Sequence, residues 1–193
     1  MQTYAGYGIY AYIYYNSNFT ARGSVSNNIV DFSASYYVYA IYAYCYGNNQ
    51  PIDMSYNTVI GRNLSSTSSS GYKYLIYAYY VDGAIHNNNL LSMDNGGTNF
   101  GLYDYYCTGS FSNNNIWDAN TGASFTFGAR NGTNVSDFND YKTQFNDKNG
   151  KNLNPLLGNI TTGDYKPTSF NFVNLGVPVK GITTDNAGVT RSG

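Results

Sequence analysis

The chain has 193 residues, enough for one domain with a continuous core. Only 11% of the residues are charged, glutamate is absent, and the formal net charge is −1. This balance excludes a basic surface that follows nucleic-acid phosphates, and no run of about 18 apolar residues predicts a membrane-spanning helix. The chain is rich instead in tyrosine (23) and asparagine (28), residues that favour strands and tight turns respectively. We therefore expect an all-β fold.

Four segments carry nearly the same phrase: an aliphatic residue, tyrosine, a small or acidic residue, and tyrosine. They begin at residues 9, 41, 76 and 102, so the separations are 32, 35 and 26 residues (41−9, 76−41 and 102−76). Repeats of this length are typical of solenoids, and the alternation has the two-residue period of a β-strand. Each repeat is therefore predicted to add one strand to a stack. The segments are Ile9–Tyr12, Ile41–Tyr44, Ile76–Tyr79 and Leu102–Tyr105.

The alternation also predicts which side chains face the core. The aliphatic residues that open the phrases should form one interior column, made of Ile9, Ile41, Ile76 and Leu102. The tyrosines should point outward; those of the last three repeats are Tyr42, Tyr44, Tyr77, Tyr79, Tyr103 and Tyr105. Asp104 takes the place that alanine has in the other repeats. We expect either a shift of register in that coil or hydrogen-bond partners for a carboxyl group near the end of the core.

An asparagine close to an apolar residue marks a second position in each repeat. Asparagine adopts left-handed backbone angles and bonds to its own turn, so it suits the corner between two strands of a coil. Stacked coils place such amides about 4.8 Å apart, where they can form a ladder. We expect the ladder to contain Asn28, Asn57, Asn89 and Asn115, with a one-residue slip between Asn88 and Asn89 left open. The apolar residues expected to face the core from a second sheet are Ile29, Val59, Leu90 and Ile116.

The two cysteines are predicted to be free thiols. Cys45 shares the inward parity of Ile41, and Cys107 lies two coils later. Coils two apart are separated by roughly 9.6 Å along the stack, whereas a disulfide needs Cα atoms within about 7 Å of each other.

The repeat fades after Arg130. We assign residues 1–130 to the stacked coils, and residues 131–193 to a last partial coil and an irregular closing segment packed on the last coils. Six of the ten basic residues lie in this second part. Its recognisable phrases are Phe145–Asn149, Asn154–Leu157, Asp164–Ser169, Gly176–Pro178 and Thr184–Gly188.

The repeat resembles the right-handed parallel β-helix of the pectate-lyase-like superfamily, through its tyrosine strands and asparagine corners over roughly residues 4–130. The closing segment is similar to that of secreted bacterial β-helix proteins, especially those of Bacteroidetes, in which Asn-Pro-Leu, Asp-Tyr-x-x-x-Ser and Gly-x-Pro phrases follow the last coil. The resemblance implies this fold and a secreted or cell-surface location. The first residues, Met1–Tyr4, lack signal-peptide features. We expect a piece of a longer protein whose other domains are partners.

The superfamily includes polysaccharide lyases and hydrolases, whose catalytic groups follow recognisable patterns. Family hydrolases use clustered aspartates with a histidine and Arg-x-Lys, and family lyases use aspartates that bind calcium together with a basic residue. Here no two aspartates are adjacent, and the one histidine, His86, precedes a run of asparagines. Arg22, Arg62, Lys73 and Arg130 fall on different coils at inconsistent offsets. We expect no catalytic residue, bound metal or cofactor, although a lyase or hydrolase remains the alternative.

The outward tyrosines have two interpretations. Stacked rings stabilise neighbouring coils, by about 0.5–1 kcal/mol for each pair. Exposed aromatic patches also mark interaction surfaces, where rings stack on sugars and phenols bond to hydroxyls. We expect a non-catalytic module that binds carbohydrate or a protein partner; a structural stalk, as in tail spikes, is a further alternative. The expected ligand-binding residues are Tyr42, Tyr44, Tyr77, Tyr79, Tyr103 and Tyr105.

Overall fold

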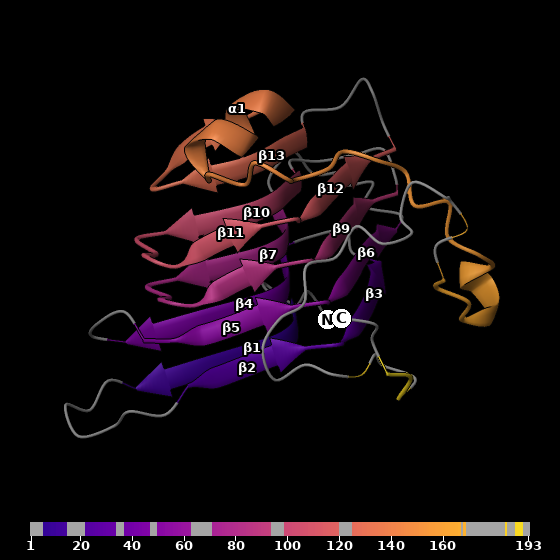
Figure 1. The fold of residues 1–193 in the computed structure, drawn as a ribbon, viewed down its shortest axis with the longest axis horizontal. Coiled ribbons are helices and arrows are strands. Elements are labelled where there is room, and N and C mark those ends of the chain that lie inside the picture. The colour runs from indigo at the N-terminus through magenta and orange to yellow at the C-terminus, as the bar shows by residue number, and fades with distance from the viewer. Residues whose placement is uncertain are drawn as a thin grey trace.

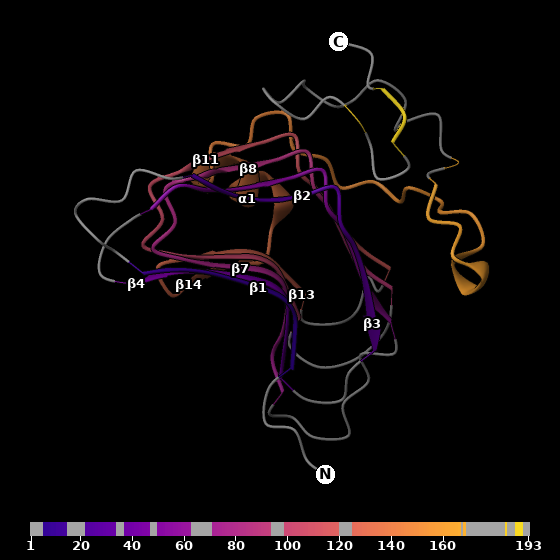
Figure 2. The same ribbon diagram turned by 90° about the horizontal axis from the view of Figure 1, so that it is seen from below.

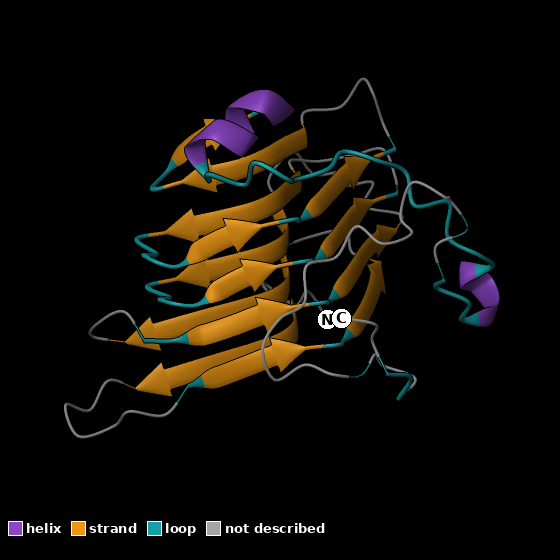
Figure 3. Ribbon diagram, viewed as in Figure 1, coloured by secondary structure: helices purple, strands orange, loops and turns teal. Residues whose placement is uncertain are grey.

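The computed structural model describes residues 6–14, 22–33, 37–46, 50–62, 71–93, 99–119, 125–166, 168, 184 and 188–190 (Figure 1). Within these residues the chain forms three parallel β-sheets, and the strands of each sheet are stacked along one common axis (Figure 3). The first sheet contains β1 (Gly6–Tyr14), β4 (Val38–Tyr46), β7 (Lys73–Tyr79), β10 (Asn99–Tyr105) and β13 (Phe125–Arg130), with the antiparallel β14 (Thr133–Val135) at its edge. The second contains β2 (Gly23–Ser26), β5 (Ile52–Ser55), β8 (Ala84–His86) and β11 (Ser110–Ser112). The third contains β3 (Ile29–Ser33), β6 (Thr58–Arg62), β9 (Asn89–Ser92) and β12 (Asn115–Asp118).

Consecutive strands enter the three sheets in turn, so each group of three forms one coil. Seen from the N-terminal end of the stack, the chain runs clockwise as it recedes from the viewer (Figure 2). The coil is therefore right-handed, the hand that parallel crossover connections almost always take. The prediction of an all-β, right-handed parallel β-solenoid is confirmed. Among the residues described, no helix is long and apolar enough to cross a membrane.

The predicted interior column is present. Ile9 pairs with Ile41, Ile41 with Ile76, and Ile76 with Leu102. Ile41, Ile76 and Leu102 are fully buried. Asp104 keeps the register, because it pairs with Ala78 on one side and with Arg130 on the other.

The buried carboxyl group of Asp104 has the hydrogen-bond partners that were expected as one alternative. One oxygen, Oδ1, accepts a hydrogen bond of 2.9 Å from the backbone N–H of Cys107. The other, Oδ2, makes no hydrogen bond but forms an ion pair with Arg130, whose Nε lies 3.2 Å away. Burial nevertheless raises the pKa of the Asp104 carboxyl. Both cysteines are buried free thiols, as predicted.

The asparagine ladder exists; Asn28 and Asn57 are members as predicted, the slip that was left open falls at Asn88, and the prediction of Asn115 is wrong. The stacked amides belong to Asn28, Asn57, Asn88 and Asn114. Each side-chain amide donates to Oδ1 of the next at 3.0 Å. Asn114 donates at the same distance to Oδ2 of Asp147, which ends the ladder.

The shift arises because the consecutive residues of each corner have different structural roles. The residue before each ladder amide adopts the left-handed conformation, with φ between 54° and 58°: Asn27, Tyr56, Asn87 and Asn113. Asn146, which precedes the terminal carboxylate of Asp147, does the same with φ of 54°. The residue after the amide already belongs to the next strand. In the Asn-Asn-Asn runs, the first asparagine therefore turns the chain, the second joins the ladder, and the third opens β9 or β12.

The same shift changes one predicted core residue. Ile29 pairs with Thr58 and is 37% exposed, so its assignment to the core was wrong. Val30 takes that place, because it pairs with the fully buried Val59. Leu90 and Ile116 continue the column and are fully buried, as predicted.

Each strand of the first sheet bends near its start (Figure 2). In β4 the adjacent residues Ala40 and Ile41 are both fully buried, and the rings of Tyr39 and Tyr42 on either side lie only 5.2 Å apart. Residues three apart in a flat strand point to opposite faces, so the bend is what brings these two rings together on the outer side.

A short helix, α1 (Phe138–Gln144), covers the C-terminal end of the stack (Figure 1). Asp137 caps its N-terminus by accepting hydrogen bonds from two backbone N–H groups. Tyr141 and Phe145 are buried against the core, and the guanidinium of Arg130 lies 5.7 Å from the Phe145 ring centroid. Solenoids need such terminal caps, because the last coil would otherwise expose its interior.

Beyond α1 the chain first follows the last coil and then returns towards the first. Lys151 pairs with Asn115 in β12. Further along, after the short 3-10 helix η1 (Ile160–Thr162), the Tyr165 hydroxyl donates to Asp31 of β3, and the Thr184 carbonyl accepts from the Asn27 amide. The Gly176–Pro178 phrase lies outside the described residues.

Candidate ligand-binding face

The six tyrosines expected to bind a ligand form two columns on the outer side of the first sheet. Tyr42, Tyr77 and Tyr103 are aligned in one column. The other column contains Tyr44, Tyr79 and Tyr105. All six side chains are half-buried, because each packs against rings of neighbouring coils.

The first column belongs to a packed aromatic group that we call the bend cluster. A further column that sequence reasoning had not assigned lies across the bend, and contains Tyr7, Tyr39, Tyr74 and Phe100. The two columns meet ring to ring: Tyr74 and Tyr77 have centroids 5.1 Å apart at an interplanar angle of 90°. Tyr77 and Tyr103 are stacked at 4.7 Å. Tyr74 and Phe100 are buried, so the bend cluster acts as a second, small core outside the coil.

Burial changes the acidity of these phenols. It raises the pKa of Tyr42, Tyr74 and Tyr77 well above the ordinary value of a tyrosine, and neighbouring phenols add to the shift. The hydroxyls of these three tyrosines therefore remain protonated and uncharged throughout the physiological range.

The second column belongs to a more open group, which we call the open patch: Tyr44, Tyr46, Tyr79, Tyr80, Tyr105 and Tyr106. Tyr46 and Tyr106 are 51% and 48% exposed. Tyr79 stacks on Tyr105 with centroids 5.0 Å apart, and Tyr80 stacks on Tyr106 at 5.3 Å.

The orientation of these rings decides which contacts they can make. Within the column, Tyr79 and Tyr105 are stacked face to face, whereas Tyr44 and Tyr79 meet edge to face at 5.0 Å and 72°. These contacts cover part of each ring and leave the rest open to solvent. Open ring faces remain at the first coil, where Tyr12 and Tyr14 are 46% and 63% exposed. The open patch is thus a neutral surface of phenol donors and acceptors with apolar edges, a chemistry that suits polyhydroxylated ligands.

The basic residues considered for catalysis are either paired with aspartates or buried in the structure. Arg22 forms an ion pair with Asp53 of the next coil, and Arg62 lies 2.7 Å from Asp31 of the preceding coil. Arg130 pairs with Asp104, as described above. Lys73 is fully buried and the pKa of its ammonium group is lowered by desolvation.

Other titratable groups are dispersed. His86 is half-buried, its Nε2 lies 3.0 Å from the Ser110 hydroxyl, and burial lowers its pKa. Within the described ranges, no three His, Cys, Asp or Glu side chains gather in a way that could hold a metal ion.

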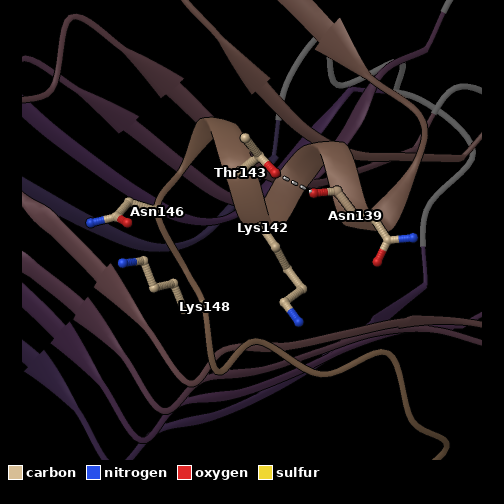
Figure 4. Close-up of a pocket in the computed structure, with 5 residues that line it drawn as sticks. All are labelled: Asn139, Lys142, Thr143, Asn146 and Lys148. Atoms are coloured by element: carbon tan, nitrogen blue, oxygen red, sulfur yellow. Dashed lines mark hydrogen bonds between the residues drawn. The ribbon is translucent and has the colours of Figure 1, made fainter.

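A shallow pocket of about 470 Å³ lies beside the C-terminal cap (Figure 4). Two basic side chains, two amides and a hydroxyl line it: Asn139, Lys142, Thr143, Asn146 and Lys148. The Thr143 hydroxyl is already bonded to the backbone carbonyl of Asn139. No acidic side chain is among the lining residues, so the pocket lacks the paired groups that acid–base catalysis requires.

The bend cluster could have been found in the sequence. An aromatic residue stands two positions before each aliphatic residue of the interior column, at 7, 39, 74 and 100. Simple alternation would place it inward with that aliphatic residue, so the regular occurrence of a large ring there was the signal for a bend.

Comparison of the chain with protein-family models, with curated proteins and with solved structures finds no match.

Proposed function

We propose that this protein is a non-catalytic module that binds a neutral polysaccharide through the open patch. The observation that carries the proposal is the concentration of partly exposed, uncharged phenols on one rigid face, with Tyr79 and Tyr105 held at 5.0 Å by the stacked coils. A patch of this kind on a protein surface usually serves recognition.

The proposal extends to the setting of the module. The tyrosine strands, the asparagine corners and the closing phrases support a secreted or cell-surface β-helix of the pectate-lyase-like type. A glycan of the extracellular environment is the ligand that such a location offers.

The expected affinity is modest. An aromatic edge or face that covers part of a sugar removes apolar area worth roughly 1 kcal/mol, at about 25 cal/mol per Å². Several such contacts, offset by the loss of freedom on binding, correspond to dissociation constants from about micromolar to millimolar.

The enzyme alternative is less favoured because the basic residues of the coils already have structural roles. Arg22, Arg62 and Arg130 each pair with an aspartate on a neighbouring coil. A lyase or hydrolase would need such groups to converge, free, on one substrate site.

The test is a glycan array with the intact protein, followed by calorimetric titration and by depolymerisation assays on every glycan that binds. The double variant Tyr44→Ala/Tyr79→Ala should lose binding at least tenfold, because both rings belong to the open patch. Tyr72→Ala is the matched control: Tyr72 is 40% exposed but lies outside the patch, so binding should be unchanged.

Two results would refute the proposal. One is unchanged affinity in the double variant while its circular dichroism spectrum stays native. The other is depolymerisation of a bound glycan by the purified protein, which would establish the enzyme instead.

A further inference from the structure

The N-terminal end of the stack, formed by β1, β2 and β3, is open within the described residues. Ile9, Ala11 and Ile13 of β1 are only partly buried, whereas their partners in β4 (Ile41, Ala43 and Cys45) are fully buried. The outward rings of β1 are about half exposed: Tyr7, Tyr10, Tyr12 and Tyr14.

The other end of the stack is closed. α1 covers the core there, and β14 runs antiparallel to β13, so no parallel strand can follow it in the same register. The ladder is closed as well, since the side chain of Asp147 has only oxygens and can accept from Asn114 without having to donate further.

The ladder has a direction, and this direction leaves one acceptor unused at the open end. Oδ1 of Asn57 accepts two hydrogen bonds from the preceding rung, from the backbone N–H of Asn28 at 3.2 Å and from its side-chain amide at 3.0 Å. Asn88 and Asn114 accept the same pair. Oδ1 of Asn28 accepts no hydrogen bond from any residue that the structure describes.

We propose that this end docks a further parallel β-coil of the same repeat type, whose corner carries an asparagine amide. The partner coil adds a strand to β1, covers Ile9 and Ile13, and places an asparagine so that its side-chain amide and backbone N–H donate to Oδ1 of Asn28. Its outward aromatic rings stack on Tyr10 and Tyr12. Strand addition of this kind combines main-chain bonds with side-chain pockets.

A second copy of this chain is a poor occupant. Its C-terminal end is covered by α1 and its ladder ends in Asp147, so that end offers no amide donor. Two N-terminal ends placed together would bring two Oδ1 acceptors of Asn28 face to face. The geometry therefore selects a partner whose last coil is uncapped and ends in an amide.

The experiment supplies such a coil as a probe on the full chain. A copy of residues 37–71 is joined directly before Ala5, which puts it in the register that the same residues hold before β7. The melting temperature should rise by on the order of 5 °C. The matched control carries Asn57→Asp in the added copy only, which replaces the amide donor by an oxygen; it should lose most of the gain.

Three outcomes would overturn the proposal. The first is an added copy that is cleaved rapidly by protease while the melting temperature stays unchanged. The second is an equal gain for the Asn and Asp versions, which would show that Asn28 does not select the partner. The third is a dimer of the unmodified protein in sedimentation that the added coil abolishes, because a second copy would then be the natural occupant.

Discussion

Asn88 and its neighbour Asn89 show how sharply the fold distinguishes identical side chains. Asn88 is fully buried, accepts two hydrogen bonds from Asn57, and donates to the Met54 carbonyl and to Asn114. Asn89 is half-buried and opens β9. One position carries a rung of the ladder, and the next begins a strand.

Replacing Asn88 by leucine should therefore lower the free energy of unfolding by more than about 3 kcal/mol. The change removes four hydrogen bonds and leaves buried donors and acceptors without partners, each at a cost of about 1–3 kcal/mol. Asn89→Ala is the matched control and should cost less than about 1 kcal/mol. Urea denaturation of both variants checks this, and equal losses would show that the ladder does not run through Asn88.

Gly83 is the residue at which the stack leaves least room. A Cβ built on it would lie within 2 Å of the Ile52 carbonyl oxygen, at 1.8 Å, and backbone atoms offer no easy relief. Gly83→Ala should thus destabilise the protein by about 3 kcal/mol or more, since the coils must move apart. At Gly6 the nearest atom would be 3.7 Å away, on the Val38 side chain. Gly6→Ala should accordingly leave the free energy of unfolding, measured by urea denaturation, within about 0.5 kcal/mol of the parent. A similar loss in both variants would contradict the prediction.

At the scale of elements, α1 is joined to the end of the ladder by a single side chain. The Tyr141 hydroxyl, fully buried, donates to Oδ2 of Asp147 at 3.0 Å. That oxygen also accepts both hydrogen bonds from Asn114. The cap and the ladder therefore depend on one carboxyl oxygen.

Tyr141→Phe should cost about 1.5–3 kcal/mol, the range for a buried hydrogen bond to an ionisable group. Tyr165→Phe is the control: its hydroxyl donates to Asp31 at 2.9 Å, but in a partly exposed site, and its loss should cost less than about 1 kcal/mol. Thermal melts of the two variants decide this. A smaller effect at Tyr141 than at Tyr165 would mean that the helix is not anchored through Asp147.

The sequence predicted the strands better than the corners and the bend, for physical reasons. Alternation is a local signal, so the column from Ile9 to Leu102 and the outward tyrosines followed directly from it. Three consecutive asparagines carry no local mark that says which one turns the chain, and neighbouring coils decide. The bend cluster arises from contacts between rings on both sides of Ala40, which alternation alone does not encode.

For the whole molecule, the raised pKa values of the bend cluster predict alkaline sensitivity. In the unfolded chain tyrosine ionises at about pH 10. Tyr42, Tyr74 and Tyr77 keep their protons to higher pH in the folded protein, so above that point the unfolded state binds fewer protons than the folded state. Their contribution to stability is complete below about pH 10 and is lost as the pH rises through the folded pKa values.

The free energy of unfolding, measured by urea denaturation between about pH 9 and about pH 12, should fall with a slope of up to about 1.4 kcal/mol per pH unit for each such tyrosine. Tyr77→Phe should remove the contribution of one titrating proton, up to about 1.4 kcal/mol per pH unit, from this slope, because phenylalanine has no ionisable group. A slope that is the same in the variant, or a stability independent of pH in this range, would show that the cluster is open to solvent.

The ladder makes the coil a unit of insertion and deletion. Each inner rung (Asn57, Asn88 and Asn114) receives the same two hydrogen bonds and passes the same pair on, so these corners are interchangeable. Removing residues 57–87, a stretch of 31 (88−57), would place Asn88 directly after Tyr56. Tyr56 has the same left-handed backbone conformation as Asn87, the residue that precedes Asn88 in the native chain. The shortened chain keeps its cap, its ladder and its strand register, whereas a deletion one residue shorter or longer would turn a whole strand inside out. Whole coils can therefore be gained or lost in evolution without disturbing the cap or the ladder.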